Sequence, residues 1–227
     1  MKPWELLGQT STPDGSDMSL TARDGEFVIR VDGKTLMSSR LHGSEEELAT
    51  MGCRLARHLQ RPQVLVGGLG MGFTLRATLD LLPAGATVSV AEVVPQVVEW
   101  NRGPLGPLAG QPLDDTRVQV LKEDVGRTLG SSPGKFDAIL LDVDNGPTAF
   151  TSTTNETLYG NEGVAAAYAA LASSGVLAVW SAWDDRKFEH RLGFHGFTAS
   201  SDRVRARAKK GGARHTIFCG LKEPGSR

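Results

Sequence analysis

The stretch Val66-Gly-Gly-Leu-Gly-Met-Gly-Phe-Thr74 decides how the chain is organised, because four of the six residues from Gly67 to Gly72 are glycines. Glycine loses more backbone entropy on folding than any other residue, so such a run is expected where the backbone turns tightly or approaches a ligand closely. The loop follows an apolar run and leads into a segment with helical spacing. This order of strand, loop and helix is typical of nucleotide-binding βα units, although a lone loop also fits a simple tight turn.

Short apolar runs alternate with helical segments beyond residue 61. The expected strands are Val64–Val66, Val88–Ala91, Val118–Leu121, Ala138–Leu141 and Val176–Trp180. Apolar strands separated by helices predict a parallel sheet that is covered on both faces. The segments 197–204 and 215–220 read as a closing hairpin. We therefore expect an α/β domain over 61–221 with a mostly parallel, seven-stranded sheet and helices on both faces.

The first 60 residues are expected to form a tail, a β-hairpin and a helix. Residues 1–24 are rich in Ser, Thr, Asp and Gly and are predicted to be loosely ordered. The segment Glu26–Met37 alternates on both sides of Asp32-Gly33, which is a hairpin signal. Ser44 with Glu47 three residues later matches a capping box, which predicts a helix that begins at Ser44.

Composition narrows the class of protein. The 227 residues are 40% hydrophobic and carry a formal net charge of −1, which argues against a general nucleic-acid binder. The cysteines Cys53 and Cys219 lack metal spacing and are expected to be buried and reduced, as in a cytoplasmic protein. The five histidines show no ligand spacing, so no metal is expected. No run approaches the roughly 20 apolar residues that span a bilayer, and no signal peptide is evident.

Acidic residues follow successive predicted strands. In open parallel sheets, ligands bind beyond the carboxyl ends of the strands. Glu92 follows the second strand and lies 20 residues beyond Gly72, where a carboxylate can accept both hydrogen bonds of a ribose diol. The alternative is a solvated acid at a strand end. With the glycine loop in place, we favour the ribose role.

Asp124 follows the third strand and has two interpretations. Its carboxylate can accept a hydrogen bond from the exocyclic amine of adenine, or it can be the N-cap of a turn over 125–130. Both can hold at once. An acid here is not generally needed by a dinucleotide enzyme, yet a protein that binds NAD stays open at this point.

Asp142 and Asp144 follow the fourth strand as a close pair. Two neighbouring acids repel each other, so a cationic partner such as an amine substrate or a sulfonium centre would stabilise both. The sequence Asp144-Asn-Gly-Pro147 is also strong turn chemistry. Asp142, directly after the strand, is the better candidate for catalysis, as the base that takes a proton from an amine.

From about residue 25 to about residue 220, these motifs together resemble the spermidine synthase family, the polyamine aminopropyltransferases on the Rossmann-like class I methyltransferase fold. The resemblance rests on VLVGGLGMG, VAEVVPQVVEWNR, LKEDVGRTL, FDAILLDVDNGP and SSGVLAVWSA, with Leu158-Tyr159 before a helix. It implies a donor that is S-adenosylmethionine or its decarboxylated form, a small acceptor that is an amine, and compatibility with a homodimer.

The resemblance also assigns residues. It implies that Gly68, Gly70 and Gly72 pass close to the methionine portion of the donor, that Glu92 holds the ribose and that Asp124 holds the adenine. Val93 and Val125 would line the same pocket, and Asp142 would sit beside the transferring group. Asp144 and Tyr159 would help to position the acceptor.

Three departures from the family pattern bear on the reaction. Aminopropyltransferases usually carry an aspartate in a loop like GGGDGG, where this chain has Gly70. Their catalytic loop usually reads DSSDP, where this chain reads Asp142-Val-Asp144-Asn-Gly. The helix before that loop usually offers a Tyr-x-Glu, and the corresponding region here, His42-Gly-Ser-Glu-Glu-Glu-Leu, lacks the tyrosine. Without the loop aspartate, the carboxylate of ordinary S-adenosylmethionine is no longer repelled, and backbone N–H groups are free to bind it. We therefore expect S-adenosylmethionine to fit at least as well as its decarboxylated form, and slightly favour methyl transfer.

Other functions stay open. A true aminopropyltransferase acting on a putrescine-like diamine is the first alternative, and a non-catalytic binding protein on the same fold is the second. The segment Arg203-Val-Arg-Ala-Arg207 places three arginines on one face of a strand. We favour its interpretation as a charged edge that prevents strand pairing over that of a nucleic-acid or acidic-partner site.

Overall fold

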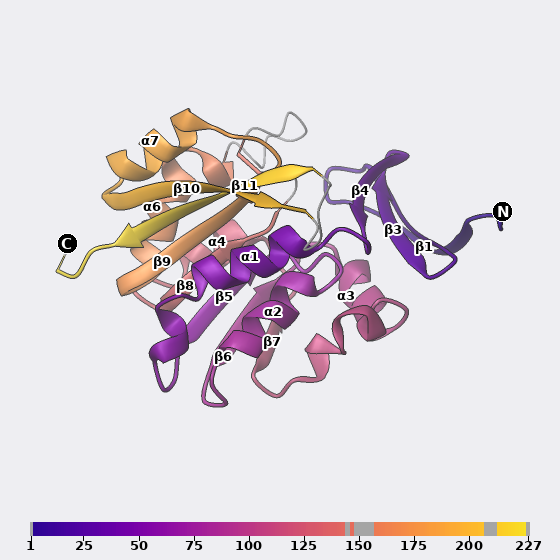
Figure 1. Ribbon diagram of the computed structural model, residues 1–227, viewed down its shortest axis with the longest axis horizontal. Helices are drawn as coiled ribbons and strands as arrows, with labels where there is room; N and C mark the ends of the chain where they lie inside the picture. The colour runs from indigo at the N-terminus through magenta and orange to yellow at the C-terminus, as the bar shows by residue number, and fades with distance from the viewer. Residues whose placement is uncertain (1, 144–145, 148–156, 207–212, 226–227) are drawn as a thin grey trace.

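A computed structural model gives the structure of the chain and describes residues 2–143, 146–147, 157–206 and 213–225. Two sheets organise it (Figure 1). A four-stranded antiparallel sheet near the N-terminus lies to one side of a seven-stranded sheet that carries helices on both faces. The expected α/β class is confirmed.

The N-terminal sheet is larger than the sequence predicts. Its strands, in spatial order, are β1 (Glu5–Ser11), β2 (Asp17–Arg23), β3 (Glu26–Val31) and β4 (Lys34–Ser38). The hairpin around Asp32-Gly33 is confirmed as β3 and β4, and both turn residues have positive φ, at 48° and 73°. The expectation that residues 1–24 are loosely ordered is wrong, because β1 and β2 pair along nearly their whole length.

A bulge interrupts the pairing of β4 with β3. Ile29 lies opposite Met37, whereas its neighbour Arg30 lies opposite Thr35, so Leu36 is an extra residue on β4. An extra residue bends the strand and re-aims the side chains that follow it. Met37 is the first residue beyond this bulge.

The large sheet has the order β10-β11-β9-β8-β5-β6-β7. Its strands are β5 (Gln63–Gly67), β6 (Thr87–Ala91), β7 (Val118–Leu121), β8 (Phe136–Leu141), β9 (Leu171–Ser181), β10 (Phe197–Arg205) and β11 (Arg214–Lys222). Strands β5 to β9 run parallel, and β10 and β11 close the sheet as an antiparallel hairpin. The chain reverses its direction of winding between β5 and β8, which is the switch point where ligands bind in such sheets.

Two apolar cores lie on opposite faces of this sheet. The helices are α1 (Gly43–Gly52), α2 (Phe73–Leu81), α3 (Pro95–Arg102), α4 (Val125–Gly130), α6 (Asn161–Ala170) and α7 (Arg186–Phe194), with 3₁₀ turns over Ala56–His58, Gly106–Ala109 and Pro112–Asp114. Side chains of α1, α2 and α3 share one core, and those of α4, α6 and α7 share the other. Val64 and Val66 of β5 enter the first core and Leu65 enters the second, as strand alternation requires.

The start of α1 differs from the prediction. Its N-cap is His42, which makes no capping hydrogen bond through its side chain, and Ser44 lies inside the first turn. The predicted capping box at Ser44 and Glu47 is therefore wrong. The backbone N–H of Gly43 instead donates to the carbonyl oxygen of Ala206 at 3.0 Å, which fixes the beginning of α1 against the end of β10. Ser44 is consequently buried rather than exposed at a helix terminus.

Candidate active site

The glycine loop after β5 lies against the residue that follows β8. Gly68 has a φ of 88°, and a Cβ atom added there would lie 2.3 Å from the carbonyl oxygen of Asp142. The backbone N–H of Asp142 donates to the carbonyl oxygen of Gly67 at 2.8 Å. Only glycine permits both this backbone conformation and this approach. The loop thus places Asp142 at the switch point of the sheet.

Glu92 is buried at the end of β6, with 8% of its surface exposed. One carboxylate oxygen accepts from the backbone N–H of Leu69 at 3.0 Å, and the other accepts from that of Val94 at 2.8 Å. Burial raises the pKa of Glu92, and these backbone bonds act in the opposite direction. Because a carboxylate offers about four lone-pair sites, both oxygens can still accept from a diol. The carboxylate is therefore joined to the glycine loop and held in one orientation.

Asp142 combines a hydrogen bond from Thr74 with a raised pKa. Its carboxylate oxygen Oδ2 accepts from the hydroxyl of Thr74, at the start of α2, at 2.6 Å. Burial raises the pKa of Asp142 to about 6, and the bond from Thr74 acts against that rise. The group is ionised at neutral pH, yet its pKa lies close enough to take up a proton efficiently.

A buried acid that interacts electrostatically with Asp142 was not predicted from the sequence. Glu45, in the first turn of α1, is 7% exposed. Burial and the neighbouring Asp142 raise the pKa of Glu45 to about 8, whereas the bond from Ser44 lowers it. The charge of Asp142 therefore favours the protonated form of Glu45.

The raised pKa of Glu45 predicts how stability depends on pH. A carboxyl whose pKa is higher in the folded state than in the unfolded chain favours folding at low pH, and this contribution is lost as pH rises through the folded value. The window runs from the ordinary 4.5 to about 8. We expect Glu45→Gln to be more stable than the wild type at pH 9, on the order of 1–3 kcal/mol, and to lose this advantage near pH 5.

Urea unfolding at the two pH values measures this difference. The matched control is Glu46→Gln, because Glu46 is exposed on the same helix and should show no pH-dependent gain. An equal stability of Glu45→Gln and wild type at pH 9 would contradict a buried, proton-holding Glu45.

The remaining predicted donor-side residues lie along the same sheet edge. Asp124 follows β7, is exposed, and caps α4 by accepting from the backbone N–H of Gly126 at 2.8 Å. The N-cap interpretation is confirmed, and the adenine role stays a prediction. Val125 is buried under the glycine loop, since a Cβ atom on Gly67 would lie 2.9 Å from its methyl group. Val93, next to Glu92, is 43% exposed.

Tyr159 supports the strand-end segment that follows β8. Its hydroxyl donates to the carbonyl oxygen of Val143 at 3.1 Å, and its ring packs edge-on against Phe188 in the core. This bond holds the backbone next to Asp142. Asp144, the second acid of the predicted pair, lies outside the described residues.

Gly70 is covered by the N-terminal sheet. It has a φ of 50°, and a Cβ atom added there would lie 2.8 Å from both the sulfur and the methyl carbon of Met37. A methionine side chain is flexible and can withdraw from such a contact. A thioether of β4 therefore lies beside the position where the resemblance places an acid.

The comparisons with known proteins agree on one architecture. A spermidine synthase in complex with the transition-state analogue AdoDATO matches with a TM-score of 0.73 and 18% identity, over 96% of this chain and 73% of that chain. Spermidine synthase from Thermotoga maritima matches with a TM-score of 0.73 and 20% identity, over 95% and 72%. The chain has the spermidine synthase fold. A probable spermidine synthase from Corynebacterium glutamicum matches with a TM-score of 0.62 and 17% identity, over 97% and 81%.

The spermidine synthase fold confirms the methyltransferase-like sheet that the resemblance implies. No protein-family model matches the sequence, and a search of curated proteins finds no match. The likeness is therefore one of structure at low sequence identity, and the chemistry has to be argued from the site.

Three side chains near the carboxyl ends of the parallel strands were not predicted from the sequence. Thr74 stands in the quoted loop sequence, but its bond to Asp142 depends on how α2 leaves the loop. Glu45 is one of three consecutive glutamates, and only the orientation of the helix selects it. Met37 reaches Gly70 only because of the bulge in β4.

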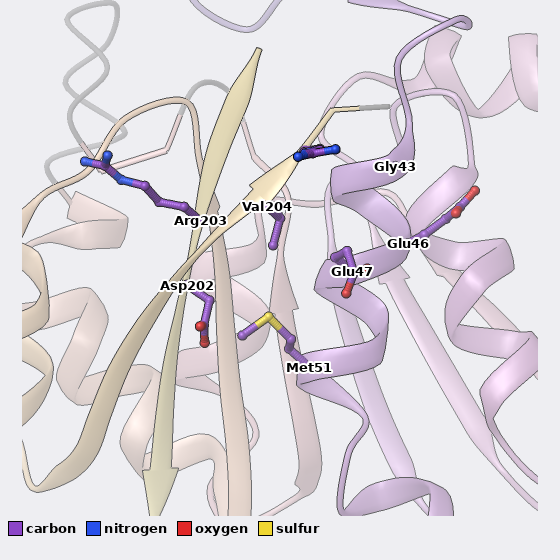
Figure 2. Close-up of a pocket in the computed structure, with 8 residues that line it drawn as sticks. Gly43, Glu46, Glu47, Met51, Asp202, Arg203 and Val204 are labelled. Carbon is purple, nitrogen blue, oxygen red and sulfur yellow. The ribbon is translucent and has the colours of Figure 1, made fainter. Parts of the chain in front are cut away.

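A groove of about 520 Å³ lies apart from these residues, between α1 and β10 (Figure 2). Its lining includes the acids Glu46, Glu47 and Asp202 and the base Arg203. The structure therefore gives α1 two different sides: Glu46 and Glu47 line the groove, and Glu45 is buried toward Asp142.

The described ranges contain neither a cluster of metal-ligand side chains nor a membrane-spanning helix. Across residues 2–143, 146–147, 157–206 and 213–225, no three His, Cys, Asp or Glu side chains come together as metal ligands would. In the same part of the chain, no helix combines the length and the apolar character that crossing a membrane requires. Cys53 and Cys219 are free and buried, and burial raises their pKa values to about 12 and about 11.

Proposed function

We propose that the chain is a spermidine-synthase-like transferase that binds an adenosyl-sulfonium donor and transfers an alkyl group to a small amine. The observation that carries this proposal is the joining of three elements at one strand edge. The glycine loop bonds to Glu92 through Leu69 and to Asp142 through Gly67. A donor held by these elements would place its reactive carbon beside the carboxylate of Asp142.

The proposed reaction requires mainly that the acceptor is positioned and that a base takes its proton. Nucleophilic displacement at a carbon next to a sulfonium needs a neutral nucleophile held in line and kept from water. Asp142 is suited to accept a hydrogen bond from the attacking amine and to take its proton as the new bond forms. Thr74 holds the carboxylate in place for this step.

We further propose that S-adenosylmethionine is the preferred donor and that a methyl group is transferred. Two features support this finer assignment: Gly70 carries no acid that would repel the carboxylate of the donor, and Met37 brings an uncharged thioether to the same place. The competing function is aminopropyl transfer from decarboxylated S-adenosylmethionine to a putrescine-like diamine. It is favoured by the structural neighbours, which are spermidine synthases.

Calorimetric titration with both donors tests the assignment. We expect the wild type to bind S-adenosylmethionine at least as tightly as its decarboxylated form. Gly70→Asp should weaken S-adenosylmethionine by at least about tenfold relative to the decarboxylated donor, because like charges placed together cost several kcal/mol. Residue 70 has the left-handed conformation that Asp and Asn tolerate best.

Gly70→Asn is the matched control, since it has the shape of Asp without the charge and should change the two affinities equally. A clear wild-type preference for the decarboxylated donor would overturn the methyl assignment and leave the transferase. Binding of NAD with no affinity for either sulfonium donor would overturn the transferase itself.

A further inference from the structure

A chain of polar side chains leads from Glu45 to β11 along the face of the sheet that α1 covers. The hydroxyl of Ser44 bonds to Oε2 of Glu45 at 2.6 Å, and Nδ1 of His215 lies 2.9 Å from the same hydroxyl oxygen. Ser44 is 1% exposed and Glu45 is 7% exposed. A hydroxyl is both a donor and an acceptor, so a hydroxyl between a carboxyl and an imidazole can pass a proton from one to the other.

His215 is the end of this series of side chains that lies nearest to solvent. It lies on β11 and is half-buried, and its ring packs edge-on against Trp180 of β9 with centroids 4.6 Å apart. Burial lowers its pKa, so the ring is neutral at pH 7 and can receive a proton. The bond between Gly43 and Ala206 fixes α1 against the β10–β11 hairpin and thereby keeps Ser44 opposite His215.

We propose that Glu45, Ser44 and His215 form a proton relay that carries the proton of the acceptor from Asp142 to the surface at β11. This inference rests on the proposed function, because the proton originates from the acceptor amine. Glu45 and His215 are the relay residues, Ser44 is the bridge between them, and none of the three is assigned to the binding of the donor.

The steps balance. The lone pair of the acceptor nitrogen forms the new N–C bond, the C–S bond breaks, and its electron pair stays on sulfur, which becomes a neutral thioether. Asp142 takes the surplus proton from nitrogen and passes it to the free oxygen of Glu45. The proton that Glu45 already held moves to Ser44, the hydroxyl proton of Ser44 moves to Nδ1 of His215, and Nε2 releases one proton to solvent. No oxidant or reductant is required.

The resting chain has two arrangements with opposite hydrogen-bond directions. When Glu45 is protonated, it donates to Ser44, which donates to Nδ1 of His215, so the imidazole proton sits on Nε2. When Glu45 is ionised, it accepts from Ser44, which accepts from Nδ1–H. The charged groups that act on Glu45 are Asp142, beyond β8, and Glu46, on α1 itself. The tautomer of His215 therefore reports the protonation state of Glu45.

Nitrogen-15 NMR of histidine-labelled full-length protein tests the relay without substrate. We expect the ring of His215, assigned with His215→Gln, to change from the Nε2–H to the Nδ1–H tautomer between pH 7 and pH 9.5. Glu45→Gln should abolish this change, and Glu46→Gln, which removes only the smallest of the effects on Glu45, should preserve it. A tautomer that stays constant over this range in the wild type would overturn the relay.

Kinetics of two Ser44 variants provides the second measurement. Ser44→Ala should lower kcat roughly tenfold with little change in KM and should diminish the solvent isotope effect, and Ser44→Thr should restore both. Unchanged kcat in a folded Ser44→Ala protein would overturn the relay. A chain that binds no sulfonium donor would refute the proposed function, and the NMR measurement would still decide whether Glu45 and His215 are coupled.

Discussion

Asp142→Asn is expected to reduce turnover by roughly 10²–10⁴-fold, because the amide cannot take the proton that the amine loses. The side chain keeps its size, and its oxygen can still accept from the hydroxyl of Thr74, which donates to the wild-type carboxylate at 2.6 Å. The affinity for the donor should therefore stay near the wild-type value. Single-turnover rates and calorimetric affinities, measured on the same preparation, separate the two effects.

Asp137→Asn provides the control for this substitution. Asp137 lies on the same strand, β8, at its amino end, where it accepts from the backbone N–H of Gln63 at 2.8 Å. Asparagine can preserve that bond, so kcat should not change. Full activity of Asp142→Asn would remove the base from the mechanism.

The same assignment predicts the acid limb of the pH–rate profile. Burial raises the pKa of Asp142 to about 6, and the base works only when ionised. The rate should accordingly fall below about pH 6, tenfold per unit, rather than near pH 4, where an ordinary aspartate loses its charge.

Gly68→Ala should have the largest effect on stability. The added methyl group would lie 2.3 Å from a backbone oxygen, that of Asp142, at a φ of 88°. A main-chain atom at the end of a central strand has little freedom to move, so we expect a loss on the order of 2–4 kcal/mol. Turnover should fall as well, since the residue that is displaced is the base.

Gly130→Ala is the matched control, because no atom lies within 4 Å of a Cβ added there. It ends α4, and its substitution should change the free energy of unfolding by less than about 1 kcal/mol. Urea unfolding followed by circular dichroism measures both variants. Equal stabilities would show that the close approach of the glycine loop to β8 is dispensable.

The parallel part of the large sheet was predictable because its strands are short apolar runs that alternate with helical segments. The N-terminal sheet was not, because β1 and β2 contain Ser, Thr, Gly and Asp at many positions and have partly exposed faces. What orders them is pairing with β3, a contact between segments that no local pattern contains. Strand formation depends on such cross-strand partners more than on intrinsic preference.

The residues of the candidate site were likewise only partly predictable from the sequence. Glu92 and Asp142 were found because a residue directly after a parallel strand must lie at the ligand-binding edge. Glu45 was not, since three glutamates in succession look alike until the helix is placed. The pattern around Ser44 even suggested an N-cap, whereas the hydroxyl is occupied by Glu45 and His215.

The bulge in β4 has a consequence for how this fold could change its substrate. Leu36 is the inserted residue, and Met37 follows it and covers Gly70. Removing Leu36 would take out the bend that aims Met37 at the loop, because a bulge bends its strand and re-aims the side chains that follow it. Discrimination between donors would then be altered by a deletion in a different sheet, with every residue of the glycine loop unchanged. In such a protein, comparing loop sequences alone would miss the change in substrate.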